Sequence, residues 1–218
     1  MEKNNFNKFV QIILDYLSSD IQSSDKMFSN LHETSLDDSN KNCMVYVYEG
    51  KKDLTVLDMD YIAKVEYKNK KGAEDKDSII NTADAFVISN DNQWFFIEFK
   101  NTKMSDVSKS LKDNIIKKAY SNWYMLLDII FSMNDFGEKY DGFNYSNPID
   151  FAKNNVTYIV VCKSCKNPTA YNLIKGCKLR GEKYTPPFML RLKDYLFKDA
   201  YLYTEEFLER EFVECFKY

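Results

Sequence analysis

The stretch TADAFVISNDNQWFFIEFKN, residues 82–101, decides the fold predicted for this chain of 218 residues. Two apolar runs flank the polar sequence SNDNQ, and this pattern is typical of a β-hairpin with a short turn. Side chains alternate faces along a strand, so Glu98 and Lys100 share one face of the second strand. Two opposite charges therefore point the same way on a strand that is otherwise apolar.

The turn decides which residues of the two strands face each other. If SNDNQ is symmetric about Asp91, antiparallel partners have positions that sum to 182, and Asp84 faces Glu98. Cross-strand neighbours lie about 5 Å apart at Cβ, so two carboxylates and the Lys100 ammonium converge at one end of the hairpin. Two carboxylates this close repel each other unless a cation lies between them. A divalent metal ion between the two carboxylates would offset their repulsion. Lys100 could orient an attacking water beside that ion or help to deprotonate it.

Periodicity predicts the elements around the hairpin. Apolar residues three and four apart predict helices at 6–22, 105–132 and 204–216, the last with Thr204 as its N-cap. β-Branched and aromatic runs predict strands at 43–50, 79–88, 93–100, 156–161 and 200–204. Residues 57–72 fit either a strand or a helix capped by Asp58 or Asp60, and the helix is favoured. The sequence NPIDFAKNN at 147–155 interrupts the pattern, and residues 163–199 are predicted to be irregular.

The order of these elements indicates an α/β protein. We expect a single domain over residues 1–218, with a core at about 44–205, an N-terminal helical segment at 1–40 and a C-terminal helix at 204–216. The hydrophobic content of 44% supplies a sizeable core. No signal peptide or apolar stretch of about 18 residues is present, so a cytoplasmic protein without a membrane span is expected.

The numbers of histidines and cysteines narrow the possible catalytic mechanisms. His32 is the only histidine, which argues against a His-rich metal site or a Ser/His/Asp triad. Five cysteines without a secretion signal indicate reduced thiols. The sequence CKSC at 162–165 has the spacing of half a zinc site, but a pair of reduced cysteines at a strand end is favoured.

Charge is distributed unevenly along a chain whose net charge is −3. Residues 163–198 carry nine basic and two acidic side chains, between acidic ends. The stretch KSCKNPTAYNLIKGCKLRGEKY interleaves cations with Tyr171 and Tyr184, as a surface that tracks a nucleic-acid backbone would. A solvated face that balances the acidic termini is the alternative.

Asp84, thirteen intervening residues and then Glu98-Phe99-Lys100 before a long helix resemble the PD-(D/E)xK, or restriction endonuclease-like, nuclease superfamily. The resemblance covers roughly residues 79–162 and in its widest extent the strand near 200. It implies a restriction endonuclease-like core, with a mixed central β-sheet flanked by helices. It also implies that Asp84, Glu98 and the Phe99 carbonyl bind Mg²⁺ or Mn²⁺ and that Lys100 serves the hydrolytic water. Ala83 stands where the motif's name has proline.

The resemblance extends to partners and to further residues. It implies nucleic acid as the substrate, DNA rather than RNA, and a possible homodimer. Similar nucleases often place a Lys or Gln on the helix after the motif, which makes Lys112 and Lys118 candidates for substrate binding. On a helical wheel, Lys112 falls near the centre of the inward stripe and Lys118 on its edge. Many members also have an acid on an early helix, and Glu33, Glu49 and Glu66 are the candidates.

Two other interpretations remain open. The first is a catalytically inactive nuclease-like scaffold that binds nucleic acid or a protein partner, including a site whose carboxylate is satisfied by an internal lysine. The second is a small protein-interaction domain of unrelated fold, in which Glu98 and Lys100 form an ordinary surface pair.

Overall fold

The computed structural model of the chain describes residues 4–17, 25–37, 44–50, 54–73, 80–104 and 108–216. In this part of the chain a six-stranded sheet has the spatial order β1-β4-β5-β6-β7-β8. Its strands are β1 (Phe28–Asn30), β4 (Thr55–Asp58), β5 (Ala85–Ile88), β6 (Trp94–Lys100), β7 (Val156–Cys162) and β8 (Asp199–Thr204). A separate two-stranded sheet pairs β2 (Leu36–Asp37) with β3 (Val45–Tyr46).

The sheet changes direction at β6. The pairs β1–β4, β4–β5 and β5–β6 are antiparallel, whereas β6–β7 and β7–β8 are parallel. Lys100, Cys162 and Thr204 consequently lie level at the carboxyl ends of three parallel strands. Ligands of open α/β sheets bind outside the carboxyl ends of the strands, and Glu98 and Lys100 lie at this end of β6. The protein is therefore a mixed α/β protein with a mixed central sheet, as the order of predicted elements indicated.

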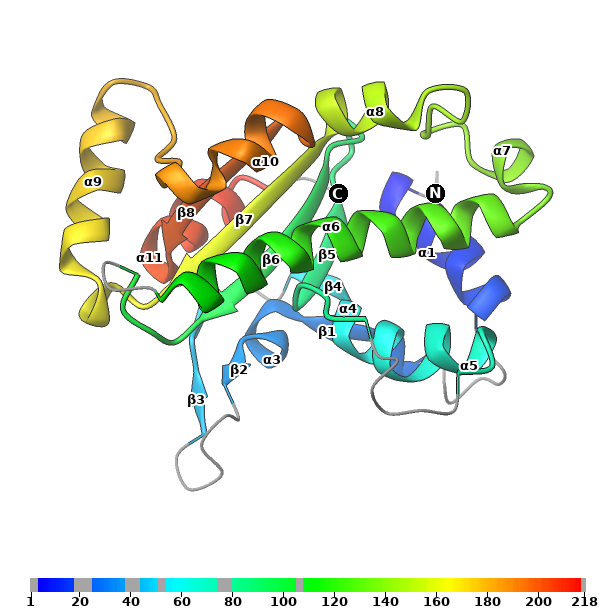
Figure 1. Cartoon of the computed structure of the whole chain (residues 1–218), viewed down its shortest axis with the longest axis horizontal. Coiled ribbons are helices and arrows are strands. Elements are labelled where there is room, and N and C mark those ends of the chain that lie inside the picture. The colour runs from blue at the N-terminus through cyan, green and yellow to red at the C-terminus, as the bar shows by residue number, and fades with distance from the viewer. Residues whose placement is uncertain are drawn as a thin grey trace.

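Helices cover both faces of the sheet. The longer ones are α1 (Asn5–Leu17), α6 (Lys109–Ser132), α8 (Pro148–Asn155), α9 (Pro168–Leu179) and α10 (Leu190–Tyr195). The short ones are α3 (Leu31–Thr34), α4 (Met59–Tyr61), α5 (Lys68–Lys70), α7 (Phe136–Lys139) and α11 (Glu205–Leu208). Helical turns at Ile62–Tyr67, Ser164–Lys166, Pro187–Met189 and Glu209–Val213 extend or precede them. Figure 1 shows α6 crossing one face of the sheet and α11 lying on the other.

Helix α6 forms because its sequence lacks proline and glycine from Lys109 to Ser132 and presents a continuous apolar stripe. Ser108 caps its start by accepting a hydrogen bond from the Leu111 amide at 3.2 Å. Ile115, Ala119 and other apolar residues of the stripe are buried against the sheet. The helix connects β6 with the parallel strand β7, and its first turns pass over the carboxyl end of β6 (Figure 1).

Trp94 is the centre of an aromatic cluster on the face of the sheet that α6 covers. Its ring centroid lies 4.9 Å from that of Phe9 in α1, 4.9 Å from that of Phe151 in α8 and 5.4 Å from that of Phe86 in β5. On the opposite face, Phe95 packs at 4.9 Å from Phe212. The alternation of faces expected for β6 is therefore confirmed.

Several elements differ from their predicted form. The sequence at 147–155 is not a break but helix α8, because Asn147 caps it and proline is accommodated in a first helical turn. The segment 163–199 is also more regular than predicted, since α9 and α10 lie within it. The strand predicted at 43–50 is reduced to Val45–Tyr46 among its described residues. Residues 57–72 divide between the end of β4 and a helical stretch capped by Asp58.

Candidate active site

The β5–β6 hairpin has the predicted register. Ala85 pairs with Ile97 and Ile88 with Trp94, so partners sum to 182, and Asp84 directly precedes the first of these pairs. The Asp84 amide donates to the Ile97 carbonyl at 3.0 Å, one residue short of the partner that a continued ladder would give it. Asn92 ends the turn in the left-handed region with φ 58°, a conformation that asparagine tolerates better than most residues. The side chains that the prediction brought together therefore do lie at one end of the hairpin.

Glu98 is a fully buried carboxylate held by two lysines. Its exposed fraction is 0%, and Lys118 Nζ donates to its Oε1 and Oε2 at 2.9 and 3.0 Å. Lys100 forms a second ion pair with Oε1. A buried carboxylate without such partners would be strongly destabilising. Both Lys100 and Lys118 are therefore the partners that offset the burial of the Glu98 carboxylate.

Asp84 lies beside this group, with its two oxygens in different surroundings. Oδ2 accepts a hydrogen bond from the Phe99 amide at 2.6 Å, while Oδ1 lies 3.7 Å from Lys118 Nζ. Burial and the neighbouring charge of Glu98 raise the pKa of Asp84 to about 8, against the opposing effect of the two lysines. These surroundings disfavour its carboxylate form, and an added cation would stabilise that form.

Lys118 carries the positive charge between the two acids. Its side chain is 14% exposed, and although burial lowers its pKa, the charges of Glu98 and Asp84 raise that pKa above the ordinary value for lysine. Lys112 is half-buried one and a half turns earlier on α6, and it forms no ion pair with either carboxylate in the part of the chain that the structure describes. The structure therefore brings Lys118, on the edge of the predicted inward stripe, to the site, and not Lys112, which lies near the centre of that stripe.

A polar cleft of about 510 Å³ opens beside these residues. Asp84, Phe99 and Lys100 line one part of it, whereas the fully buried Glu98 lies behind them. The other lining residues are Ser35, Leu36 and Asp37 at β2, Val47 after β3, Asp60 in α4, Asn101 and Thr102 after β6, and Leu111 in α6. Solvent and a ligand therefore reach the site from the side of Asp84 and Lys100.

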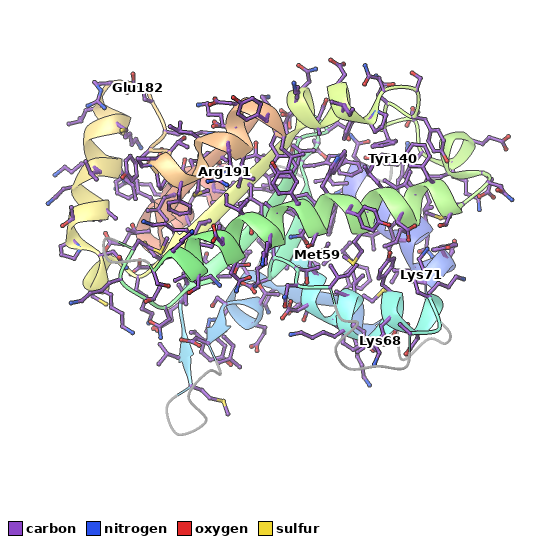
Figure 2. The ribbon with its side chains drawn as sticks, viewed as in Figure 1. Met59, Lys68, Lys71, Tyr140, Glu182 and Arg191 are labelled. Atoms are coloured by element: carbon purple, nitrogen blue, oxygen red, sulfur yellow. The ribbon has the colours of Figure 1, made fainter. Side chains whose placement is uncertain are left out.

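Asp60 is the acid that sequence reasoning did not identify. It lies in α4, where it accepts a hydrogen bond from Thr82 Oγ1 at 2.9 Å and lines the cleft together with Asp84. The Met59 amide donates to the Asp84 carbonyl at 3.3 Å, which attaches the start of this helix to the hairpin. Figure 2 shows Met59 at this start and Lys68 and Lys71 at the far end of the helical stretch. Only the fold brings Asp60 to Asp84, although the sequence did mark Asp60 as a possible cap.

The three early-helix candidates take other positions. Glu33 is exposed on α3, and Glu49 is exposed and pairs with Lys163 at 3.1 Å. Glu66 is buried and accepts a hydrogen bond from the Tyr61 hydroxyl at 3.1 Å. The side chains of all three lie outside the lining of the cleft, so the structure brings none of them beside Asp84 there.

The oxygen donors of the site fit a small divalent cation. Asp84 and Glu98 already share one cation, since the Lys118 ammonium lies within 3.7 Å of the first and 2.9 Å of the second. Carboxylate and carbonyl oxygens are the ligands that Mg²⁺ prefers, and two protein carboxylates suffice because water completes its shell. Among the described residues, no three His, Cys, Asp or Glu side chains are grouped closely enough to hold a metal by themselves. A metal here would therefore rely on solvent or substrate oxygens.

The rim of the cleft near β7 is held by a chain of polar contacts. Lys166 Nζ donates to Asn101 Oδ1 at 2.7 Å, and Asn101 Nδ2 donates to Asp37 Oδ2 at 2.9 Å. Asn167 continues this rim, because its side chain accepts from the Met104 amide at 2.5 Å and donates to the Thr102 carbonyl at 3.0 Å. These contacts fix the segment that follows Lys100, so the mouth of the cleft is a defined surface.

The remaining candidates lie away from this site. Cys162 is buried at the end of β7 and Cys165 is exposed, and every cysteine in the described residues is free, while Cys43 lies outside them. His32 stacks on Tyr46 at 3.9 Å, and its Nδ1 lies 2.9 Å from the Tyr48 carbonyl oxygen. The zinc interpretation of CKSC therefore gains no ligands from the described residues.

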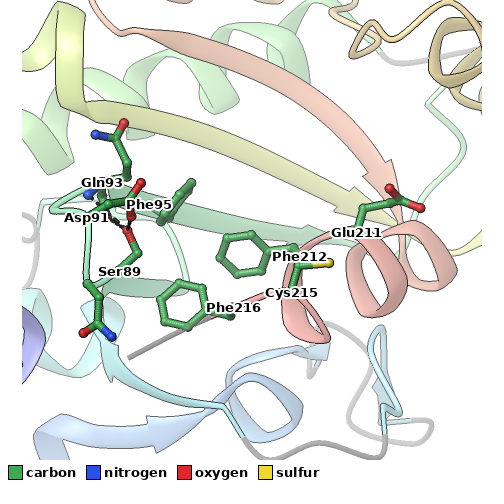
Figure 3. A pocket seen from close by; sticks show the side chains of 9 residues that line it. Ser89, Asp91, Gln93, Phe95, Glu211, Phe212, Cys215 and Phe216 are labelled. Carbon is green, nitrogen blue, oxygen red and sulfur yellow. Dashed lines mark hydrogen bonds between the residues drawn. The ribbon is translucent and has the colours of Figure 1, made fainter.

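The aromatic residues of the basic stretch are not presented to solvent as stacking platforms. Tyr171 packs at 5.4 Å from Phe207, and Tyr184 is half-buried against the core. A different hollow of about 330 Å³ lies near the β5–β6 turn, where the rings of Phe95, Phe212 and Phe216 gather (Figure 3). Its lining is largely apolar, and it lies on the face of β6 opposite to Glu98.

A comparison of the chain with protein-family models, with curated proteins and with solved structures found no match. No helix in the described residues is both long and apolar enough to cross a membrane. Any function assigned to the chain therefore depends on the chemistry of the cleft and its charged residues.

Proposed function

We propose that the chain is a metal-dependent nuclease of the PD-(D/E)xK type, which hydrolyses phosphodiester bonds of nucleic acid, with DNA as the first substrate to test. One observation carries the proposal: Asp84, Glu98 and Lys100 converge at the end of one hairpin, with Asp84 and Lys100 lining a polar cleft. The mixed sheet, in which this hairpin is followed by α6 and the parallel strand β7, supports a restriction endonuclease-like core.

In this proposal, Asp84, Glu98 and the Phe99 carbonyl hold Mg²⁺ or Mn²⁺. The ion would supply a Lewis acid for the phosphoryl oxygen and a lower pKa for a water molecule that it binds. Asp60 lines the same cleft and adds a further carboxylate near Asp84. The pKa of Asp84, raised by its surroundings, falls when a cation is bound, so the ion and the carboxylate stabilise each other.

Lys100 has the position for handling the attacking water. Its side chain is 17% exposed, it lines the cleft, and Glu98 anchors its ammonium. A lysine held in this way can donate a hydrogen bond to a water in the cleft and orient it toward phosphorus. The water oxygen forms the new bond to phosphorus and releases a proton to solvent in the cleft, the bond to one sugar oxygen breaks, and that oxygen takes up a proton from solvent.

The second candidate function is a nuclease-like scaffold that binds nucleic acid or a protein partner without cutting. The ion pairs of the site favour it, because the ammonium groups of Lys100 and Lys118 already balance the charges of Asp84 and Glu98. Such a scaffold would bind DNA with an affinity that decreases as salt rises, and it would bind neither Mg²⁺ nor Mn²⁺. Metal titration followed by DNA binding at two salt concentrations separates the two functions.

The decisive experiment is a cleavage assay on plasmid, single-stranded DNA and RNA in Mg²⁺, in Mn²⁺ and in EDTA. We expect metal-dependent cleavage by the wild-type protein, with a loss of at least about 100-fold in Glu98→Gln and in Lys100→Ala. Glu138→Gln and Lys153→Ala alter exposed residues of α7 and α8 and serve as controls that keep full activity. Circular dichroism of each variant verifies folding. Cleavage that persists in folded Glu98→Gln and Lys100→Ala would refute the proposal.

A further inference from the structure

Lys118 occupies the position between the two carboxylates that a metal would need. Its Nζ lies 2.9 and 3.0 Å from the two Glu98 oxygens and 3.7 Å from Asp84 Oδ1. The helix that presents it is anchored at this point, because the neighbouring Ala119 is fully buried and Asn122 Nδ2 donates to the Lys118 carbonyl at 2.8 Å. The ammonium therefore belongs to the site and is not an exposed surface charge.

The contacts of Lys118 leave little room for a second cation at Glu98. Lys118 engages both oxygens of this carboxylate, and Lys100 engages Oε1 as well. Mg²⁺ binds oxygen at about 2.1 Å and tolerates little departure from octahedral geometry. Glu98 can therefore bond to such an ion only after the Lys118 ammonium has moved away from at least one of its oxygens.

The same contacts keep the site assembled when no metal is bound. Asp84 and Glu98 lie beside each other at the end of the hairpin, and the charge of Lys118 offsets the repulsion between their carboxylates inside the protein. Removal of that charge leaves two neighbouring acids with Lys100 as their remaining close cation among the residues that the structure describes. A divalent ion can replace Lys118 in this role because it contributes at least as much positive charge at the same place.

We infer that Lys118 is a resident cation: it holds Asp84 and Glu98 together in the metal-free protein and competes with a divalent metal for Glu98. This inference rests on the proposed metal site, but it concerns the energetics of metal binding and not the chemistry of cleavage. It makes Lys118 a positioning residue whose loss weakens the metal-free protein and strengthens metal binding.

The experiment compares wild-type protein with Lys118→Met, which removes the charge and keeps the length of the side chain. Lys118→Gln is a second variant, whose amide can still donate to one Glu98 oxygen. Lys117→Met is the control, because Lys117 is the adjacent and exposed residue of α6. Thermal unfolding in EDTA measures the stability of the metal-free protein, and isothermal titration with MnCl₂ measures metal affinity.

We expect Lys118→Met and Lys118→Gln to melt at lower temperature than wild type in EDTA and to bind Mn²⁺ at least about 5-fold more tightly. The melting temperature of both variants should rise more on addition of Mn²⁺ than that of wild type, and Lys117→Met should match wild type throughout. A Mn²⁺ affinity that is unchanged or weaker in both Lys118 variants overturns the inference, and so does an absence of Mn²⁺ binding in all four proteins.

Failure of this inference is distinguishable from failure of the proposed function. If the wild type cleaves DNA with Mn²⁺ but the Lys118 variants bind Mn²⁺ no more tightly, the nuclease function stands and the competition does not. If the Lys118 variants bind Mn²⁺ more tightly and no protein cleaves, the resident cation stands and the nuclease function fails.

Discussion

Asp84 Oδ2 accepts a hydrogen bond at 2.6 Å from the main-chain amide of Phe99, the residue that follows Glu98 on the neighbouring strand. The hairpin thus fixes Asp84 twice, through its own amide, which donates to the Ile97 carbonyl, and through its side chain. Asp84 Oδ1 is left to face Lys118. The geometry of the candidate site is therefore a direct consequence of the register of β5 and β6, and the turn between them deserves the first test.

Asn92 is the residue of this turn whose replacement tests the register. Its backbone has φ 58°, and its Oδ1 accepts hydrogen bonds from Trp94 Nε1 at 3.1 Å and from the Tyr140 hydroxyl at 2.9 Å. We expect Asn92→Ala to lower the free energy of unfolding by about 2 kcal/mol, since it loses these two contacts and the hydrogen bond that Asn92 Nδ2 donates to the Gly142 carbonyl, and keeps a Cβ at positive φ. Asn92→Gly also loses the side-chain contacts, but glycine adopts positive φ without strain, so this variant should lower the free energy of unfolding by less. Urea denaturation measures both, and a greater loss in Asn92→Gly would contradict this account.

The stability of the metal-free protein should fall as pH rises, because Asp84 titrates far above its ordinary value of 3.8. Above that value the unfolded chain has lost a proton that the folded protein keeps until about pH 8, so the free energy of unfolding decreases between these two points. Lys118, whose pKa is raised, contributes a pH dependence only above its ordinary value of 10.5.

Asp84→Asn has no proton to exchange and should flatten this dependence. Urea denaturation in EDTA at about pH 5 and pH 8 measures the slope, with the exposed Asp194→Asn as the control that keeps the wild-type slope. An Asp84→Asn protein whose stability falls with pH as steeply as that of wild type would show that Asp84 is not the group responsible.

Asp60 should contribute to metal binding, although sequence reasoning favoured other acids. It lines the cleft with Asp84, and Thr82 Oγ1 orients it. We expect Asp60→Asn to weaken Mn²⁺ binding about 10-fold, as loss of a carboxylate near a metal commonly does. Titration calorimetry measures the affinity, and Glu33→Gln is the matched control on α3. Equal affinities for Asp60→Asn and Glu33→Gln would remove Asp60 from the site.

Two buried tyrosines differ in whether the hydroxyl group has a hydrogen-bond partner among the described residues. The Tyr158 hydroxyl is fully buried and has no hydrogen-bond partner in the described part of the chain, whereas that of Tyr140 donates to Asn92. We expect Tyr158→Phe to leave the free energy of unfolding unchanged or to raise it by about 1 kcal/mol, and Tyr140→Phe to lower it by about 1 kcal/mol. Denaturation curves decide this. Equal losses in both variants would indicate that a partner, such as a buried water, satisfies Tyr158.

Local pattern was sufficient to predict the part of the fold that carries the site. The turn residues and the alternation in β6 predict the hairpin and its register, and the uninterrupted stripe predicts α6. The alignment of Asp84 with Glu98 follows from these two strands alone, so a single sequence contains it. The β-branched run at Val156–Cys162 likewise predicts β7, although not that it runs parallel to β6.

Features that depend on contacts between distant segments were beyond the sequence pattern. Asp60 reaches Asp84 only because β4 pairs with β5, and Glu33, Glu49 and Glu66 were equally plausible until that pairing was known. The choice between Lys112 and Lys118 depends on how α6 crosses β6, which a helical wheel does not specify. The sequence analysis kept open a carboxylate satisfied by an internal lysine, but only the fold shows that Lys118 is that lysine.

The most direct test of the account is a crystal structure of the wild-type protein soaked in MnCl₂, with anomalous scattering to locate the ion. The account predicts a peak within bonding distance of an Asp84 oxygen and a Glu98 oxygen, with the Lys118 ammonium moved away from Glu98. An anomalous map without a peak between these carboxylates, in which Lys118 still bridges them at saturating Mn²⁺, would contradict it.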